Sequence, residues 1–156
     1  MALEMIFDWN SSLTDGFPVI PWGLQQVLEY FKEKYGNPPL YIHENGQITE
    51  SSTTKLNDTS RVQYIQVHIE GLLEAMRNGS NTKGYFVWSF LDLFELLDGY
   101  GSSFGLYYVD FNDKDLRRTP KLSAHWYSNF LKGNGIGSHA EIQVEKNTFS
   151  YAHSSQ

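Results

Sequence analysis

Residues 40–46, Leu40-Tyr41-Ile42-His43-Glu44-Asn45-Gly46, decide how the rest of the chain is interpreted. Leu40, Tyr41 and Ile42 form an apolar run that is too short for a helix, and they predict a brief buried strand closed by Asn-Gly. Glu44 follows at or just past the carboxyl end of this strand. Parallel α/β sheets and (β/α) barrels carry their chemistry at that end, so Glu44 is the first candidate catalytic residue. Spacing alone also allows Glu44 to be a solvated turn residue.

The segments on either side of this stretch predict two helices. Upstream, apolar residues at helical spacing follow Pro21, a favoured first helical residue, and predict a helix that ends at Gly36. Downstream, residues 47–57 are polar and predict a surface loop, after which Asp58 is the expected N-cap of a second helix ending at Gly79. The predicted apolar faces consist of Leu24, Val27, Leu28 and Phe31 in the first helix, and of Val62, Ile65, Ile69, Leu72, Leu73 and Met76 in the second.

A second strand is predicted at residues 84–90, a near-continuous apolar run typical of a strand buried on both faces of a parallel sheet. Strands that alternate with helices in this way indicate βα crossover units. Residues 92–103 predict a loop rich in acids and glycine, and residues 104–111 a second extended segment. Residues 120–131 predict a last helix, whose apolar side consists of Leu122, Trp126, Phe130 and Leu131.

Composition excludes several classes of function. Twelve Lys and Arg stand against 18 Asp and Glu, a formal net charge of −6, which argues against nucleic acid and membrane surfaces as partners. No apolar run reaches the ~18 residues of a membrane span. Cysteine is absent, so disulfides and thiolate chemistry are excluded. His125, His139 and His153 show no ligand spacing, and no metal is assigned.

Three sequons make Asn10, Asn57 and Asn78 candidate N-glycosylation sites. They fit a protein of the secretory pathway, whereas the acidic amino terminus has no visible signal peptide. The localisation of the chain therefore stays open.

The stretch Tyr-Ile-His-Glu-Asn-Gly at residues 41–46 and the stretch Trp-Ser-Phe-Leu-Asp-Leu-Phe-Glu at residues 88–95 resemble two motifs of glycoside hydrolase family 1, the plant β-glucosidase group. Residues 41–46, Tyr-Ile-His-Glu-Asn-Gly, are similar to the family's (Ile/Val)-Thr-Glu-Asn-Gly motif. Residues 88–95, Trp-Ser-Phe-Leu-Asp-Leu-Phe-Glu, are similar to its later Trp-Ser-x-x-Asp-Asn-x-Glu-Trp motif. The resemblance continues through residues 99–110 and the run Arg-Thr-Pro-Lys at residues 118–121, and it covers about residues 18–132.

The resemblance implies a (β/α)8 barrel, of which this chain holds the carboxyl-terminal portion, about the last two βα units plus the preceding helix. Two parallel strands cannot close a barrel, and a complete one takes ~250 residues, so we expect an α/β fold that is incomplete as a closed barrel. The expected domains are a partial barrel, residues 1–132, and a tail, residues 133–156. The tail is expected to be partly disordered, with one candidate strand at residues 141–144.

By the family's pattern, Glu44 is the nucleophile that attacks the anomeric carbon and forms a glycosyl-enzyme ester. The resemblance also implies that Trp88 packs on the glucose ring, that Glu95 hydrogen-bonds its hydroxyls, and that Phe104 lies near the sugar. Without the resemblance, Trp88 and Phe104 would be core aromatic residues and Glu95 a loop acid. No cofactor is implied.

Leu96 departs from the family's pattern, because it replaces a tryptophan whose indole N–H would donate to a sugar hydroxyl. That loss costs ~1–3 kcal/mol if the hydroxyl stays unpaired. His43 stands in place of the usual threonine, and Leu93 in place of a common asparagine. The family's acid/base glutamate lies in an Asn-Glu-Pro motif, which this sequence lacks. Without that acid ~10²–10⁴-fold in rate is lost, so we expect the isolated chain to be inactive.

The sequence therefore predicts a retaining β-glucosidase-like hydrolase acting on a small-molecule β-D-glucoside, present as a truncated chain. Two alternatives stay open. One is a non-catalytic remnant or interaction product of a truncated gene or splice form. The other is a parent enzyme that transfers glucose from acyl-glucose donors. The sequence does not indicate an oligomeric state.

Overall fold

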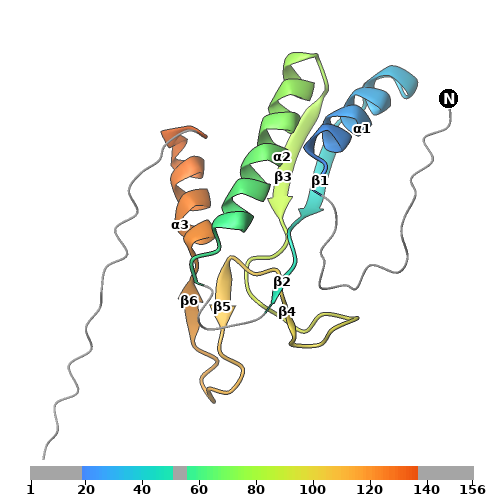
Figure 1. Ribbon diagram of the computed structural model, residues 1–156. Helices are drawn as coiled ribbons and strands as arrows, with labels where there is room; N and C mark the ends of the chain where they lie inside the picture. Colours follow the sequence, from blue (N-terminus) through green and yellow to red (C-terminus); the bar gives the residue numbers. More distant parts are fainter. Residues whose placement is uncertain (1–18, 51–55, 137–156) are drawn as a thin grey trace, which may run out of the picture.

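The computed structural model describes residues 19–50 and 56–136, which form an open arrangement of helices and short strands (Figure 1). In chain order the elements are α1 (Pro21–Lys34), β1 (Leu40–Asn45), β2 (Thr49–Glu50), α2 (Thr59–Arg77), β3 (Thr82–Val87), β4 (Ser102–Ser103), β5 (Tyr107–Val109), β6 (Arg118–Pro120) and α3 (Leu122–Asn129). A π-helical turn, Phe130–Asn134, follows α3.

β1 and β3 lie side by side in parallel, and α2 is the crossover between them. Their carboxyl ends point toward β2 and β4, a short antiparallel pair in which Thr49 lies opposite Ser103 (Figure 1). β5 and β6 form a second antiparallel pair. The loops that carry the candidate site residues therefore gather at the carboxyl ends of the parallel strands.

The two longer helices begin and end at the residues that the sequence predicts. Pro21 occupies the first turn of α1, and Gly36, with a φ of 70°, follows its C-cap residue. Asp58 is the N-cap residue of α2, but its side chain makes no capping hydrogen bond. The carboxylate binds Arg61 and Ser123 instead, so a residue predicted as a helix cap is part of a buried ionic network.

Two apolar clusters hold the helices against the strands. One joins α1 and α2 through Leu28, Leu72 and Ala75, and the partly buried Leu40 and Ile42 of β1 pack against it. The other cluster packs α2 against α3 and the segment before β5. Its buried members are Ile65, Ile69, Leu106, Ala124 and Trp126. Both clusters use most of the residues that helical periodicity predicts for the buried faces.

The prediction that the strand at residues 84–90 is buried on both faces is wrong for this chain, and β1 is likewise open on one face. Successive strand side chains point to opposite faces, and only one face of β1 and β3 packs against α1 and α2. On the other face Tyr41 and Phe86 are each 56% exposed, and their rings both lie near the ring of His43. The described residues supply no layer over this face, which in a closed barrel is the interior.

Several predicted boundaries and burials also differ. β1 continues past Ile42 to Asn45, and β3 runs from Thr82 to Val87 rather than over residues 84–90. α3 begins at Leu122, because Pro120 belongs to β6 and pairs with Tyr107 of β5. The predicted loop at residues 47–57 contains β2, and only part of residues 104–111 is a strand. The core residues that turn out exposed are Val27, Phe31, Met76 and Leu131.

Asn10 and the candidate strand at residues 141–144 lie outside the described residues. Within residues 19–50 and 56–136, no helix has both the length and the apolar character that a membrane crossing requires.

Candidate functional site

Glu44 is the penultimate residue of β1, and its side chain is exposed. Strand alternation starting from Leu40 and Ile42 would turn Glu44 toward the helices. The pairing register with β3 shifts between Ile42 and Asn45, so His43 and Glu44 are both exposed. Asn45, and not Glu44, takes the position that faces the helices. Such an irregularity re-aims a side chain, and here it presents the carboxylate at the end of the strand.

Asn45 fixes this strand end to two other elements. Its backbone carbonyl accepts a hydrogen bond from Trp88 N at 2.9 Å. Its side-chain Oδ1 accepts from the hydroxyl of Tyr85 in β3 at 2.7 Å, and its Nδ2 donates to the hydroxyl of Tyr64 in α2 at 3.3 Å. The residue next to Glu44 is thus held by three partners, one through its backbone and two through its side chain, while the side chain of Glu44 stays exposed.

The position of Gly46 leaves no room for a side chain. A Cβ at this position would lie 1.8 Å from the carbonyl oxygen of Trp88. The chain that leaves β1 therefore passes in direct contact with the backbone of the candidate sugar-binding tryptophan. The peptide between Trp88 and Ser89 is cis.

Trp88 and Glu95 lie in the loop after β3, and both are partly buried. Burial raises the pKa of the Glu95 carboxyl, the negative charge of Asp92 raises it further, and a hydrogen bond with the side chain of Trp88 lowers it. Oε1 of Glu95 is buried with no hydrogen-bond partner among the described residues. A carboxyl held in this way can donate to or accept from a hydroxyl group of a ligand.

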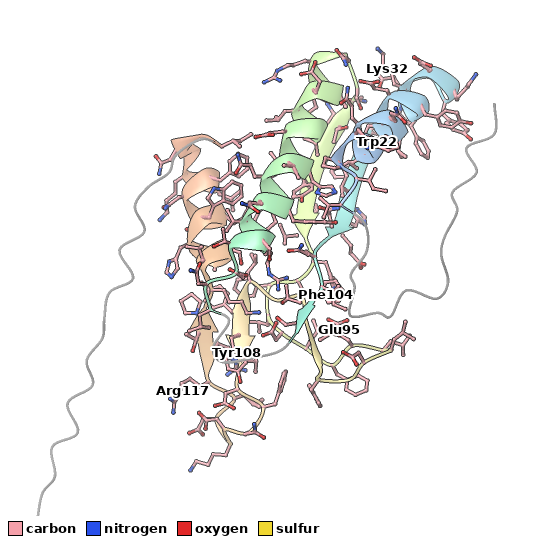
Figure 2. All side chains as sticks on the ribbon, viewed as in Figure 1. Trp22, Lys32, Glu95, Phe104, Tyr108 and Arg117 are labelled. Carbon is pink, nitrogen blue, oxygen red and sulfur yellow. The ribbon has the colours of Figure 1, made fainter. Side chains whose placement is uncertain are left out.

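Phe104 is partly buried and, like Glu95, lies below the arrowheads of β1 and β3 in the view of Figure 2. Leu96 is 90% exposed. The structure therefore places Trp88, Glu95 and Phe104 in loops at the carboxyl ends of the parallel strands, the same end at which Glu44 stands. Leu96 follows Glu95 directly but projects into solvent.

Sequence reasoning missed a buried ionic network beneath these loops. Arg61, at the start of α2, is fully buried and uses all five of its N–H groups. Its partners are Asp58 Oδ2 at 2.8 Å, the carbonyls of Gln47 and Phe104 at 2.7 Å each, Thr49 Oγ1 at 2.7 Å and the carbonyl of Ser103 at 3.0 Å. A helix residue followed by an apolar run gave no sequence signal of this role.

Lys121 and Asp92 form the second half of the network. Lys121 Nζ donates to Asp92 Oδ1 at 2.9 Å, to Ser103 Oγ at 2.6 Å and to the carbonyl of Gly105 at 2.8 Å. Both residues belong to stretches that resemble the family motifs, which was the signal that could have singled them out. Burial lowers the pKa of Lys121, and its hydrogen bond to Asp92 opposes that change.

The two described sequons differ in their surroundings. Asn57 is exposed, and its Oδ1 accepts a hydrogen bond from the hydroxyl of Thr59 at 2.9 Å. Asn78 is exposed as well, but its Nδ2 donates to Glu29 Oε1 at 2.7 Å, and its carbonyl accepts from Lys32. No cluster of three or more His, Asp or Glu that could hold a metal ion occurs in the part of the chain that the structure describes.

Comparison with known proteins agrees with the fold and shows the family of the chain. Residues 5–136 match the sequence profile described as Glycosyl hydrolase family 1. The chain is 55% identical over 134 residues to β-glucosidase 11 of Arabidopsis thaliana, covering 85% of this chain and 26% of that protein. It is 54% identical over 138 residues to a cyanidin 3-O-glucoside 5-O-glucosyltransferase (acyl-glucose) of Dianthus caryophyllus, covering 84% and 28%.

Solved structures give the same result. A family 1 β-glucosidase from Thermotoga maritima in complex with isofagomine lactam superposes with a TM-score of 0.70 and 39% identity, covering 76% of this chain and 27% of that one. A rice β-glucosidase variant in a covalent complex with Glc superposes with a TM-score of 0.66 and 36% identity, covering 70% and 24%.

The chain belongs to glycosyl hydrolase family 1 and adopts part of its (β/α)8 barrel without closing it, as the sequence predicts. It spans about a quarter of the length of the relatives that it matches.

Proposed function

We propose that Glu44 is the nucleophile of a retaining glycoside hydrolase that acts on β-D-glucosides, and that Trp88, Glu95 and Phe104 contact the glucose unit. The observation that carries this proposal is the register shift that exposes Glu44 while Asn45 is held by Tyr64, Tyr85 and Trp88. A nucleophile must be accessible to the substrate and yet placed to within a fraction of an ångström. The strand end meets both conditions.

In this reaction Glu44 attacks the anomeric carbon, the bond to the aglycone breaks, and a glycosyl ester forms on the carboxylate. Water then hydrolyses the ester with net retention of configuration. Retaining enzymes place an acid/base carboxyl ~5–5.5 Å from the nucleophile to protonate the leaving oxygen. The Asn-Glu-Pro motif of that residue is absent from these 156 residues, so we expect hydrolysis only where the rest of the barrel is supplied.

Glu95 supports the binding role through its raised pKa and its contact with Trp88. A sugar hydroxyl can both donate and accept, and a buried carboxyl oxygen with no partner among the described residues is suited to it. Trp88 offers an aromatic face on which the apolar C–H patches of a pyranose can pack.

Transfer of glucose from an acyl-glucose donor is a second candidate function, favoured by Leu96. This side chain is 90% exposed and has no N–H to offer a sugar hydroxyl, and a relative that is 54% identical is an acyl-glucose-dependent glucosyltransferase. An acyl-glucose releases a carboxylate, a much weaker base than an alkoxide. Its departure therefore depends less on protonation by a general acid.

The test uses a chimera in which residues 5–136 replace the matching part of Arabidopsis β-glucosidase 11. We expect the chimera to hydrolyse a nitrophenyl β-glucoside and the isolated chain to be inactive. Turnover of an acyl-glucose with an anthocyanidin glucoside acceptor, without turnover of the nitrophenyl glucoside, would instead favour transfer. In the hydrolase, Leu96→Trp should raise kcat/KM for the glucoside by roughly 5- to 150-fold, the equivalent of ~1–3 kcal/mol.

A further inference from the structure

Two buried cations hold the chain around Phe104 from two different helices. Arg61 of α2 donates to the carbonyls of Ser103 and Phe104 at 3.0 and 2.7 Å. Lys121, the residue before α3, donates to Ser103 Oγ at 2.6 Å and to the carbonyl of Gly105 at 2.8 Å. Residues 103–105 are therefore fixed on both backbone and side-chain atoms, and with them the start of the extended segment that Phe104 opens.

Asp92 connects residues 103–105, the segment clamped by Arg61 and Lys121, to the loop that carries Trp88 and Glu95. Its Oδ1 accepts hydrogen bonds from Ser103 Oγ at 2.7 Å, Gly105 N at 2.9 Å and Lys121 Nζ at 2.9 Å. Asp92 lies four residues after Trp88 and three before Glu95 in the sequence. A single carboxylate oxygen thus ties the loop 88–95 to the clamped segment.

The packing leaves this arrangement little freedom. The side chains of Lys121 and Asp92 are only 4% and 1% exposed, and an uncompensated charge at such a site is strongly destabilising. A Cβ on Gly105 would lie 2.2 Å from Asp92 N, so the two backbones are in direct contact. Backbone hydrogen bonds from Ser89 N to Phe104 O at 3.1 Å and from Leu106 N to Ser89 O at 2.9 Å complete the connection.

We propose that Lys121 is a positioning residue for Trp88 and Glu95, acting through Asp92. The proposal rests on the proposed function only in treating Trp88 and Glu95 as glucose contacts. Lys121 itself is buried and meets no ligand. Its role is to neutralise Asp92 so that this carboxylate can be enclosed against Ser103 and Gly105, which sets the path of the loop on which both contacts stand.

Charge gives this role a signature that loss of packing alone would not produce. The negative charge of Asp92 raises the pKa of Glu95. The positive charge of Lys121 Nζ, 2.9 Å from Asp92 Oδ1, partly cancels that negative charge. Arg61 and Tyr108 also lie within the electrostatic reach of Asp92. Removing the positive charge of Lys121 should therefore raise the pKa of Glu95 further, whereas removing the negative charge of Asp92 should lower it.

The first test is amide hydrogen exchange of the full chain, read by mass spectrometry. In Lys121→Met we expect peptides covering residues 88–107 to exchange at least tenfold faster, while peptides of α2 are unchanged. Lys114→Met, at an exposed lysine on the turn after β5, should change exchange neither in residues 88–107 nor in α2. Unaltered exchange of residues 88–107 in Lys121→Met would overturn the proposal.

Asp92→Asn decides the matter if Lys121→Met accelerates exchange in α2 as well. Asparagine keeps an oxygen acceptor for Ser103 and Gly105 but leaves Lys121 without its counter-charge. Faster exchange confined to residues 88–107 supports the proposal, and unchanged exchange there overturns it.

The second test is titration of the Glu95 carboxyl by ¹³C NMR, with its signal assigned through Glu95→Gln. The pKa should move downward in Asp92→Asn and upward in Lys121→Met relative to the unmodified chain. Changes in the same direction, or none, would contradict action through Asp92. Neither test uses a sugar, so a chimera inactive on glucosides would overturn the proposed function and leave these outcomes intact.

Discussion

The hydroxyl of Tyr85 donates to Oδ1 of Asn45 at 2.7 Å, across the two parallel strands and directly beside the exposed Glu44. This bond holds Asn45 in the helix-facing position that it gains from the register shift. The same shift turns Glu44 away from the helices. Burial raises the pKa of Tyr85, so its hydroxyl keeps its proton and remains a donor at all ordinary pH values.

Tyr85→Phe should lower the free energy of unfolding by about 1 kcal/mol, because it leaves a partly buried amide oxygen without its donor. In the chimera it should lower kcat for a nitrophenyl glucoside more than it raises KM, since it disturbs the proposed nucleophile Glu44 and not the proposed glucose contacts. Tyr30→Phe, on the exposed side of α1, is the matched control and should alter neither constant. A pure KM effect would show that the bond does not serve Glu44.

Arg61 and Arg77 allow a comparison of two ion pairs with the same sequence spacing. Each arginine lies 2.8 Å from an acid three residues before it, Asp58 and Glu74 respectively. The first pair is 1% and 4% exposed, the second 70% and 46%. Arg61→Met should cost ~3–5 kcal/mol, because Asp58 stays buried without its partner, whereas Arg77→Met should cost ~0–1 kcal/mol.

Urea unfolding followed by far-UV circular dichroism measures both costs. Similar destabilisation by the two substitutions would mean that the buried network contributes nothing beyond an ordinary surface pair.

His68 should make the stability of the chain depend on pH. Burial lowers its pKa from the ordinary value of 6.5, an effect that the hydrogen bond to the carbonyl of Tyr64 opposes. Between the lowered value and 6.5 the folded chain binds fewer protons than the unfolded chain. The free energy of unfolding therefore falls as the pH falls through this range, with a slope of at most about 1.4 kcal/mol per pH unit.

His68→Gln should flatten this dependence below pH 6.5, and His125→Gln, at an exposed position on α3, should leave it unchanged. Thermal unfolding of the three proteins at a series of pH values tests the difference. A slope that survives in His68→Gln would assign it to other groups.

We propose Asn57, and not Asn78, as the glycosylated sequon of the described chain. Asn57 is exposed at the amino end of α2, whereas Asn78 Nδ2 already donates to Glu29 at 2.7 Å, and a glycan there would replace one of its two N–H groups beside that contact. In the folded product secreted from a yeast host, peptide mass spectrometry should find glycan on Asn57 and little on Asn78. High occupancy of Asn78 in that product would contradict the assignment.

Much of the fold could be predicted because its signals are local. The apolar spacing within α2, with Ile65, Ile69 and Leu72 buried, and the glycines after α1 and α2 depend only on neighbouring residues. The exposure of Tyr41 and Phe86 could not be predicted, because an apolar run has the same pattern whether or not a layer covers it. β2 and β4 could not be predicted either, because each strand has only two residues and forms only through pairing with the other.

The site divides in the same way. Glu44, Trp88, Glu95 and Phe104 stand in motifs that can be recognised from their order in the chain. The register shift at Glu44 and the partners of Arg61 depend on residues far apart in the sequence, such as Thr49 with Ser103. Asp58 shows the limit most clearly, because its N-cap position was predictable and the use of its carboxylate by Arg61 and Ser123 was not.

The assignment of Glu44 as nucleophile is tested most directly by covalent trapping in the chimera. A 2-deoxy-2-fluoro-β-glucoside with an activated leaving group should form a stable ester, and peptide mass spectrometry should map the added sugar to Glu44. Glu44→Gln should fold, as judged by an unchanged thermal transition, and should carry no label. A labelled Glu44→Gln chimera, or a label on another carboxylate of the unsubstituted one, would contradict the account.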